Sequence, residues 1–186
     1  MSDVLHLRPS DARRVPWKNG RGFTDELALW PRGASFEKGD FLWRVSRATV
    51  EESGPFSAFP GFERVLVVTQ GAGLVLEHGT LASRAQVERL VPYRFSGDWP
   101  TRAELVEGRV EDFNVLCRRG DARADVEVWT ASSPRSVAAA RDEHVFVHFL
   151  ASAESLWLPP GSSTSLRDTP ECIAVRIHTA ATAGIP

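Results

Sequence analysis

Three segments of the sequence combine basic and polar side chains at spacings that suit the binding of a small anion. In the first, residues 15–22, Trp17, Lys18 and Asn19 would supply an apolar wall, an ammonium group and an amide. The two glycines of this segment let a loop adopt left-handed backbone conformations and approach a ligand closely. The alternative is a surface turn in which Trp17 packs into the core.

The second segment, residues 40–50, is typical of a strand and contains two arginines. Because side chains alternate between the faces of a strand, Arg44 and Ser46 share one face and Arg47 lies on the other. Both faces mix polar and apolar residues, so the pattern does not decide which arginine points inward. We favour Arg44; the alternative is that one arginine is exposed and the other forms a salt bridge.

The third segment, residues 54–64, is a loop rich in Pro, Gly and Phe that leads into an apolar strand. A guanidinium group at the start of such a strand needs a partner, because burying it alone is costly. If the partner of Arg64 is an internal carboxylate such as Glu63 or Asp112, the arginine is structural. If it is a ligand carboxylate, two parallel hydrogen bonds would hold the ligand. The sequence leaves both interpretations open.

Motifs of common metal and catalytic sites are missing from the sequence. There is no His-x-His pair, and His144 and His148 would lie about 13 Å apart along a strand. Two ligands of one ion each lie near 2 Å from it, so this pair cannot chelate alone. GxSxG, HExxH and phosphate-loop patterns are also absent. We therefore expect no metal, no cofactor and packed or surface histidines, and we favour binding over catalysis.

Short apolar runs separated by Gly, Pro, Ser and Asp must position these segments. The predicted strands are residues 26–30, 41–50, 64–69, 73–77, 87–90, 102–106, 113–117, 126–130, 144–150, 155–158 and 172–178. Many short strands with close turns favour a sandwich or a barrel. Two short helices are predicted, at residues 9–14 and at residues 133–143, where Pro134 precedes an Ala-rich stretch.

A strand–turn–strand pattern in residues 64–77 recurs in residues 144–158. It predicts an all-β chain of two similar halves that share one core and form a single unit over residues 1–186. The first half would cover residues 1–125, with the N-terminal segment, and the second residues 126–180. Residues 181–186 are small and polar enough to form a frayed tail.

Composition excludes several classes of partner. The formal net charge is −2 over 186 residues, without a long run of basic residues, which argues against nucleic acid or an anionic membrane. Neither a signal peptide nor an apolar stretch near ~20 residues is present, so the cytoplasm is the expected location. Cys117 and Cys172 lie in apolar stretches, and buried thiols are favoured over a disulfide.

Several short motifs together resemble the HutD/Ves family. They are Trp17-Lys-Asn-Gly20, Trp43-Arg44-x-Ser46, Gly54-Pro-Phe-Ser57, Phe59-Pro-Gly61 with Arg64, Asp112-Phe-Asn114 and Leu158-Pro-Pro-Gly161. Each tetrapeptide alone is weak, but the ordered set is specific and spans most of the chain. One departure is Arg21, which stands where the family pattern would have a further glycine and puts the identity of the ligand in doubt.

The resemblance implies a bicupin of the RmlC-like cupin superfamily, built from two double-stranded β-helices and associated with histidine utilisation. Members are thought to bind N-formylglutamate or a related intermediate and to restrain expression of the pathway. Carried over by motif, the implied ligand-binding residues are Lys18, Asn19, Arg44, Ser46, Ser57, Phe59, Arg64 and Asn114.

The function expected from these observations is metal-free binding of a small anionic metabolite that modulates histidine utilisation. One alternative is a metal-independent isomerase or hydrolase acting on a small carboxylate, in which Asp25, Glu26 or Asp112 would pair for acid–base chemistry. Another is a stress-induced protein of the Ves type, whose surface matters more than its pocket. A homodimer is preferred, because cupin-type sheets with an uncovered edge strand tend to pair.

Overall fold

The computed structural model describes residues 3–17, 22–79, 83–130, 133–167 and 169–180. The chain divides into two compact units. The central unit contains Arg13–Arg119, and the terminal unit combines Met1–Ala12 with Gly120–Pro186. The predicted division lay at residue 125 with the N-terminal segment in the first half, whereas strand β1 (Leu5–Leu7) pairs with β15 (Ser155–Leu158) of the terminal unit.

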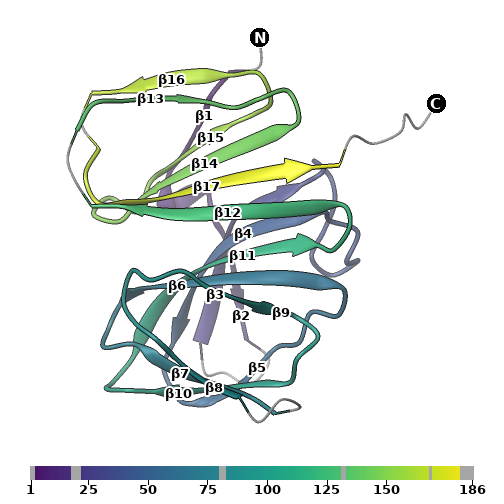
Figure 1. Cartoon of the computed structure of the whole chain (residues 1–186), viewed down its shortest axis with the longest axis vertical. Coiled ribbons are helices and arrows are strands. Elements are labelled where there is room, and N and C mark those ends of the chain that lie inside the picture. The colour runs from purple at the N-terminus through teal and green to yellow at the C-terminus, as the bar shows by residue number, and fades with distance from the viewer. Residues whose placement is uncertain (1–2, 18–21, 80–82, 131–132, 168, 181–186) are drawn as a thin grey trace. The chain divides into compact units, whose positions relative to one another are not determined.

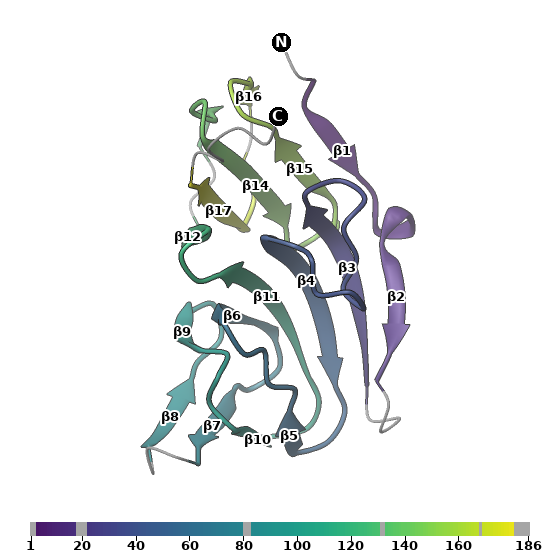
Figure 2. The same ribbon diagram turned by 90° about the vertical axis from the view of Figure 1, so that its right-hand side faces the viewer.

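The central unit contains a six-stranded antiparallel sheet with the order β2-β3-β4-β11-β6-β9. Its strands are β2 (Arg13–Pro16), β3 (Gly22–Trp30), β4 (Trp43–Val50), β6 (Phe62–Gln70), β9 (Tyr93–Ser96) and β11 (Val110–Arg118). Figure 2 shows β2, β3, β4 and β11 lying next to one another in this order. The long strands β4, β11 and β6 therefore form the middle of the sheet.

A four-stranded sheet with the order β5-β10-β7-β8 completes the central unit. Its strands are β5 (Gly54–Phe56), β7 (Leu74–His78), β8 (Ser83–Val87) and β10 (Thr101–Leu105). In β7, Leu74, Leu76 and His78 are buried while the residues between them are partly exposed, the alternation of a strand with one face in a core. The core joins both sheets and comprises Val50, Leu66, Val68, Leu74, Leu76, Val87, Phe95, Ala103 and Val110.

The terminal unit contains a five-stranded antiparallel sheet with the order β1-β15-β14-β17-β12 and a two-stranded sheet of β13 and β16. Its remaining strands are β12 (Ala122–Trp129), β13 (Arg135–Ala138), β14 (Glu143–Phe149), β16 (Ser163–Leu166) and β17 (Cys172–Thr179). Figure 1 shows β12 beside β17 and β13 beside β16. Buried Val145, Val147, Leu158 and Cys172 belong to the core of this unit. The predicted all-β fold is thus confirmed.

Both predicted helices are wrong in extent or in type. Residues 133–143 contain strand β13, in which Val137 is buried and pairs with Thr164 of β16. Here the pairing with a distant strand overrides the local helix preference of alanine. The other predicted helix is reduced to a 3-10 turn at Pro9–Asp11, because Arg13 already begins β2 and pairs with Glu26.

The proposed equivalence of residues 64–77 and 144–158 is also wrong. Strands β14 and β15 are hydrogen-bonded to each other, whereas β6 and β7 belong to different sheets. Gly71 and Gly73 adopt φ values of +95° and +113° between β6 and β7, and these left-handed conformations carry the chain from one sheet to the other.

Two further observations concern the chain as a whole. Cys117 and Cys172 are both buried free thiols, as predicted. Among the described residues, no helix has the length and apolar character that crossing a membrane requires.

Candidate functional site

Strands β4, β11 and β6 place two arginines on one face of the six-stranded sheet. Arg44 lies opposite Leu116 of β11, and Leu116 lies opposite Arg64 of β6. Two strand spacings therefore separate the Cα atoms of the arginines, about 9.5 Å. Ser46 and Asn114 face each other one step further along the same face. This pairing brings four of the predicted site residues together.

Arg44 is buried, with 5% of its surface exposed. Its Nε donates a hydrogen bond of 2.8 Å to Oε2 of Glu26, and its guanidinium carbon lies 4.3 Å from the centre of the Phe36 ring. Burial lowers the pKa of Arg44, and the bond to Glu26 opposes this shift. The described residues provide no hydrogen-bond partner for the Nη atoms of Arg44. They are available to bind an anion.

Arg64 is also buried and is bound to an amide rather than to a carboxylate. Its Nε and Nη2 donate hydrogen bonds of 2.8 and 2.6 Å to Oδ1 of Asn114. The rings of Phe56, Phe59 and Phe95 lie 4.8, 5.8 and 5.2 Å from the guanidinium carbon. Burial lowers the pKa of Arg64 to about 10, so the side chain stays charged at neutral pH. Its Nη1 has no hydrogen-bond partner within the described part of the chain.

Asp112 lies two residues before Asn114 on the same face of β11 and is 1% exposed. Its Oδ1 accepts a short hydrogen bond from Nδ2 of Asn114, while its Oδ2 is buried without a hydrogen-bond partner in the described structure. Burial raises the pKa of Asp112 to about 7, although the charge of Arg64 acts in the opposite direction. Arg64, Asn114 and Asp112 therefore form one chain of hydrogen bonds. The alternative that an internal carboxylate such as Asp112 is the partner of Arg64 is therefore met only indirectly, because the amide of Asn114 lies between them.

Aromatic rings connect the two arginines. Phe36, which lies beneath Arg44, makes an edge contact with Phe59 at a centroid distance of 5.9 Å, and Phe59 belongs to the rings around Arg64. Aromatic faces attract guanidinium groups without using their N–H donors. The rings therefore shield the two guanidinium groups partly from water, and the outer N–H groups can still donate hydrogen bonds to an anion.

The two predicted serines differ in their burial and in their position relative to the arginines. Ser46 is 2% exposed and lies between Glu26 and Asn114 in the sheet register. Ser57 is exposed and directly follows β5. It is connected with the site only as the chain neighbour of Phe56, whose ring lies near Arg64.

Lys18 and Asn19, like Arg21, lie outside the described residues. Their neighbour Trp17 packs against the core of the central unit and donates a hydrogen bond of 2.9 Å to Oγ1 of Thr24. Trp17 therefore has the core position that was the alternative for this segment.

Two alternatives for the arginine partners are resolved by the structure. Arg47 points to the opposite face of β4 and forms an ion pair of 3.2 Å with Asp25. Glu63 pairs with Arg119 at 3.0 Å rather than with Arg64.

Sequence reasoning missed Phe36 and Phe95. They come from the loop before β4 and from β9, and no spacing in the sequence connects either ring with an arginine. Glu26 was considered only as an acid–base residue. Its pairing with Ser46 across β3 and β4 is the signal that would have found it, and this requires the strand register.

The histidines are packed or exposed residues, as predicted. His144 and His148 are buried, and their Nδ1 atoms are engaged by Nε1 of Trp157 at 3.1 Å and by Oγ of Ser155 at 2.9 Å. Burial lowers the pKa of His144 to about 4, so it is neutral near pH 7. No group of three or more His, Cys, Asp or Glu residues suited to a metal ion occurs in the described ranges.

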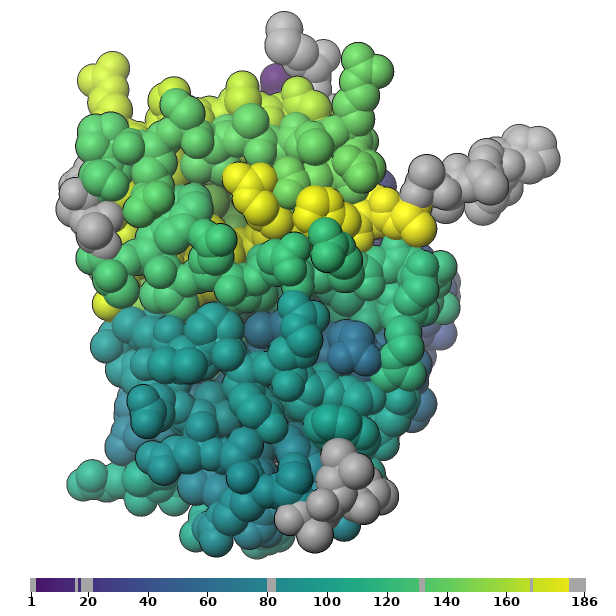
Figure 3. Space-filling view, viewed as in Figure 1, coloured from purple at the N-terminus to yellow at the C-terminus, as the bar shows by residue number. Residues whose placement is uncertain are grey.

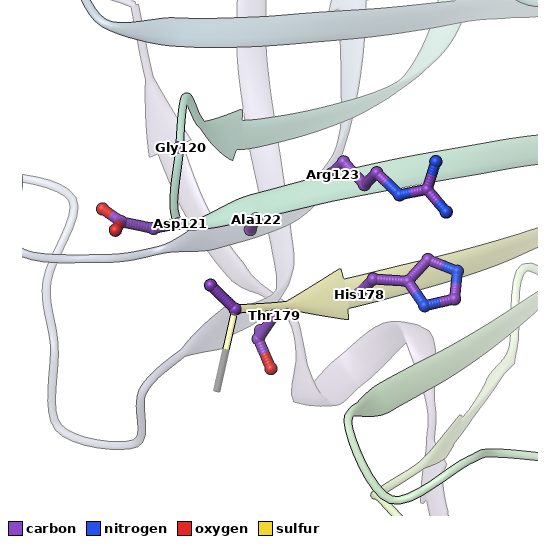
Figure 4. A pocket seen from close by; sticks show the side chains of 7 residues that line it. Gly120, Asp121, Ala122, Arg123, His178 and Thr179 are labelled. Carbon is purple, nitrogen blue, oxygen red and sulfur yellow. The ribbon is translucent and has the colours of Figure 1, made fainter. Parts of the chain in front are cut away.

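A shallow hollow of about 380 Å³ lies at the surface of the terminal unit (Figure 4). It is lined by Gly120, Asp121, Ala122, Arg123, His178, Thr179 and Ala180. Arg123 and His178 extend in the same direction from β12 and β17 (Figure 4), and part of β17 is visible at the surface as yellow atoms in Figure 3. The Arg123 side chain is 71% exposed. Because its charged groups are solvated, this hollow is a weaker candidate than the buried arginine site.

Comparison with known proteins places these features in a family. The family model HutD matches residues 9–178. An uncharacterised 21.2 kDa protein in the hutC 3' region of Pseudomonas putida is 37% identical over 136 residues, 72% of this chain and 68% of that protein. The protein Ves of Citrobacter koseri is 38% identical over 122 residues, 63% of this chain and 61% of that protein.

Solved structures agree with this result. A HutD from Pseudomonas fluorescens SBW25, solved in a formate condition, has a TM-score of 0.81 and 27% identity, covering 96% of this chain and 100% of that chain. A pirin from Escherichia coli in complex with nickel(II) has a TM-score of 0.66 at 8% identity, covering 95% of this chain and 99% of that chain, which shows the fold alone. The chain therefore belongs to the HutD family and has its cupin-like fold.

Proposed function

We propose that the central unit binds a small carboxylate between Arg44 and Arg64. The observation that carries this proposal is the pair of buried guanidinium groups on one sheet face, with outer nitrogen atoms that the described residues leave without hydrogen-bond partners. A carboxylate matches the parallel N–H groups of arginine, and its hydrogen bonds with a charged donor are stronger than those between neutral groups. An entering carboxylate would satisfy both cations at once.

Within that class, we propose N-formylglutamate or a related intermediate of histidine degradation as the ligand, bound in the cytoplasm without a metal. Membership of the HutD family and the relative from the hutC region support the link with histidine utilisation. Ser46 and the amide of Asn114 offer hydrogen bonds that suit a formyl or amide group. Binding would serve to modulate the use of histidine. A homodimer stays part of the proposal and is checked by light scattering.

Isothermal titration calorimetry tests binding directly. Purified protein is titrated with formate, N-formylglutamate, urocanate and glutamate. We expect a dissociation constant in the micromolar to millimolar range for at least one of them, because a few charge-assisted bonds of roughly 1.5–3 kcal/mol each must offset the cost of association. Absence of heat from all four at millimolar concentration would overturn the proposal.

Arg64→Met provides the matched test of the site, with Arg84→Met as control. Arg84 is exposed and pairs with Glu104 at 2.6 Å on the outer face of the other sheet. We expect Arg64→Met to weaken binding at least tenfold and Arg84→Met to leave it unchanged. Thermal unfolding of both variants separates a lost contact from a lost fold.

One observation favours an enzyme as the second candidate. Burial holds the pKa of Asp112 at about 7, a value that suits a general base at neutral pH. A metal-independent hydrolase would release formate from N-formylglutamate, whereas a binding protein would not. Measuring free formate after prolonged incubation distinguishes the two.

A further inference from the structure

When both acids are ionised, the charges of the two arginines and the two acids around the proposed carboxylate site balance one another. Arg44 pairs with Glu26 at 2.8 Å, and Arg64 is joined to Asp112 through the amide of Asn114. A carboxylate that enters brings a negative charge that these described groups do not balance while both acids are ionised. Since a buried charge without compensation costs several kcal/mol, one of the acids must change its protonation state.

Of the two acids, Asp112 is the one placed to take up a proton. Glu26 accepts a direct hydrogen bond from Arg44 and its side chain is 14% exposed. Asp112 is 1% exposed, and its Oδ2 has no hydrogen-bond partner in the described structure. A carboxyl group that gains a proton loses its negative charge and becomes a hydrogen-bond donor at that oxygen. Its pKa near 7 means that the proton binds at little cost in neutral solution.

The neighbours of Asp112 leave few other groups that could take this role. On the same face of the sheet, the charged groups include Arg64 of β6, Arg44 of β4, Glu26 of β3 and Arg13 of β2, which lies opposite Glu26. Tyr93 of β9 also lies on this face, and burial raises its pKa, so its hydroxyl already carries its proton. From the opposite sheet, the titratable group is His78, and burial lowers its pKa and keeps it neutral near pH 7. The arginines already carry their protons. The uptake therefore falls to Asp112.

We infer that the site takes up one carboxylate together with one proton, which Asp112 holds at Oδ2. This inference rests on the proposed carboxylate site. The proton comes from solvent, the ligand keeps all its bonds, and the charge of the occupied site stays balanced. It also defines the ligand class: an acid that places a single carboxylate among the buried groups, with any second carboxylate remaining in contact with water.

Calorimetry with sodium formate in two buffers measures the linkage. HEPES and Tris differ in heat of ionisation and neither carries a carboxylate or phosphate group, so the difference in observed heat reports the protons bound per ligand. Between pH 7 and pH 9 we expect an uptake that approaches one proton. The dissociation constant should rise about fivefold from pH 7 to 8 and about tenfold from pH 8 to 9, given a pKa of about 7 for Asp112 in the free protein.

Asp112→Asn identifies the group, with Asp125→Asn as the matched control at an exposed carboxylate of the terminal unit. We expect Asp112→Asn to bind formate without proton uptake and with a constant affinity from pH 7 to 9, and Asp125→Asn to behave as the wild type. Absence of formate binding by the wild type at every pH would overturn the proposed function. Binding without proton uptake, or uptake that persists in Asp112→Asn, would overturn this inference alone. If the variant fails to fold, the wild-type measurement still decides whether a proton is taken up with the ligand.

Discussion

Arg64 donates two hydrogen bonds to a single atom, Oδ1 of Asn114, across the boundary between β6 and β11. The same amide donates to Asp112 from its nitrogen atom. One neutral side chain therefore separates a buried cation from a buried acid and holds each in a fixed orientation. We therefore expect that replacing Asn114 by an apolar residue of similar size destabilises the protein.

Asn114→Leu should lower the free energy of unfolding by about 2–4 kcal/mol, because it leaves Arg64 and Asp112 buried without their shared partner. Chemical denaturation at pH 7 measures the effect. Ser57→Ala, at an exposed position, should change stability by less than about 0.5 kcal/mol. A loss below about 1 kcal/mol in Asn114→Leu would contradict the structural role of the amide.

The two arginines of β4 should differ in their effect on ligand binding. Arg44→Met should weaken formate binding at least tenfold, because it removes one of the two buried cations. Arg47→Met should leave binding unchanged, since Arg47 lies on the opposite face and Asp25 keeps its pair with Arg14 at 2.7 Å. Calorimetry of both variants checks this, and equal losses in the two would argue against a site on the inner face.

Asp112 should make the protein less stable as the pH rises from 4 to 7. Its pKa is raised to about 7 in the folded protein from 3.8, so the folded state binds more protons than the unfolded state in this range. The free energy of unfolding therefore falls as the pH rises, by at most roughly 4 kcal/mol. Asp112→Asn should remove this slope and be the more stable protein at pH 8. A wild type that is more stable than the variant at pH 8 would contradict the expectation.

His144 should act in the opposite direction over an overlapping range. Burial lowers its pKa from 6.5 to about 4, so the unfolded state binds the extra proton and stability is lost as the pH falls from 6.5 towards 4. His144→Gln keeps an acceptor for Trp157 and should be less sensitive to acid by about 2 kcal/mol. Unfolding curves at pH 4.5 and 7.5 measure this, with His6→Gln, an exposed histidine, as control.

Strands with strong apolar patterns could be predicted from the sequence, whereas short strands defined by their partners could not. Residues 155–158 form β15 with the predicted bounds, because Leu156, Trp157 and Leu158 mark a buried run. The sequence predicts a helix where β13 lies, because Pro134 and the alanines at 138–140 favour that conformation and only β16 provides the competing partner. Local preference decides where no distant strand intervenes.

The candidate site shows the same division. The motifs predict Arg44, Ser46, Arg64 and Asn114 as site residues, and the sheet register brings these four together. The rings of Phe36 and Phe95 and the pairing of Arg44 with Glu26 depend on loops and on strands that are distant in sequence. No periodicity of a single segment contains that information.

The pairing of β1 with β15 has a consequence for synthesis on the ribosome. The chain is synthesised from its N-terminus, so Leu5–Leu7 can pair with Ser155–Leu158 only after the latter has left the exit tunnel. The whole of Arg13–Arg119 is translated in the meantime and can reach its native state first. Strand β1 therefore remains without its partner β15 while most of the chain is translated, and it can join β15 only after Arg13–Arg119 has been made.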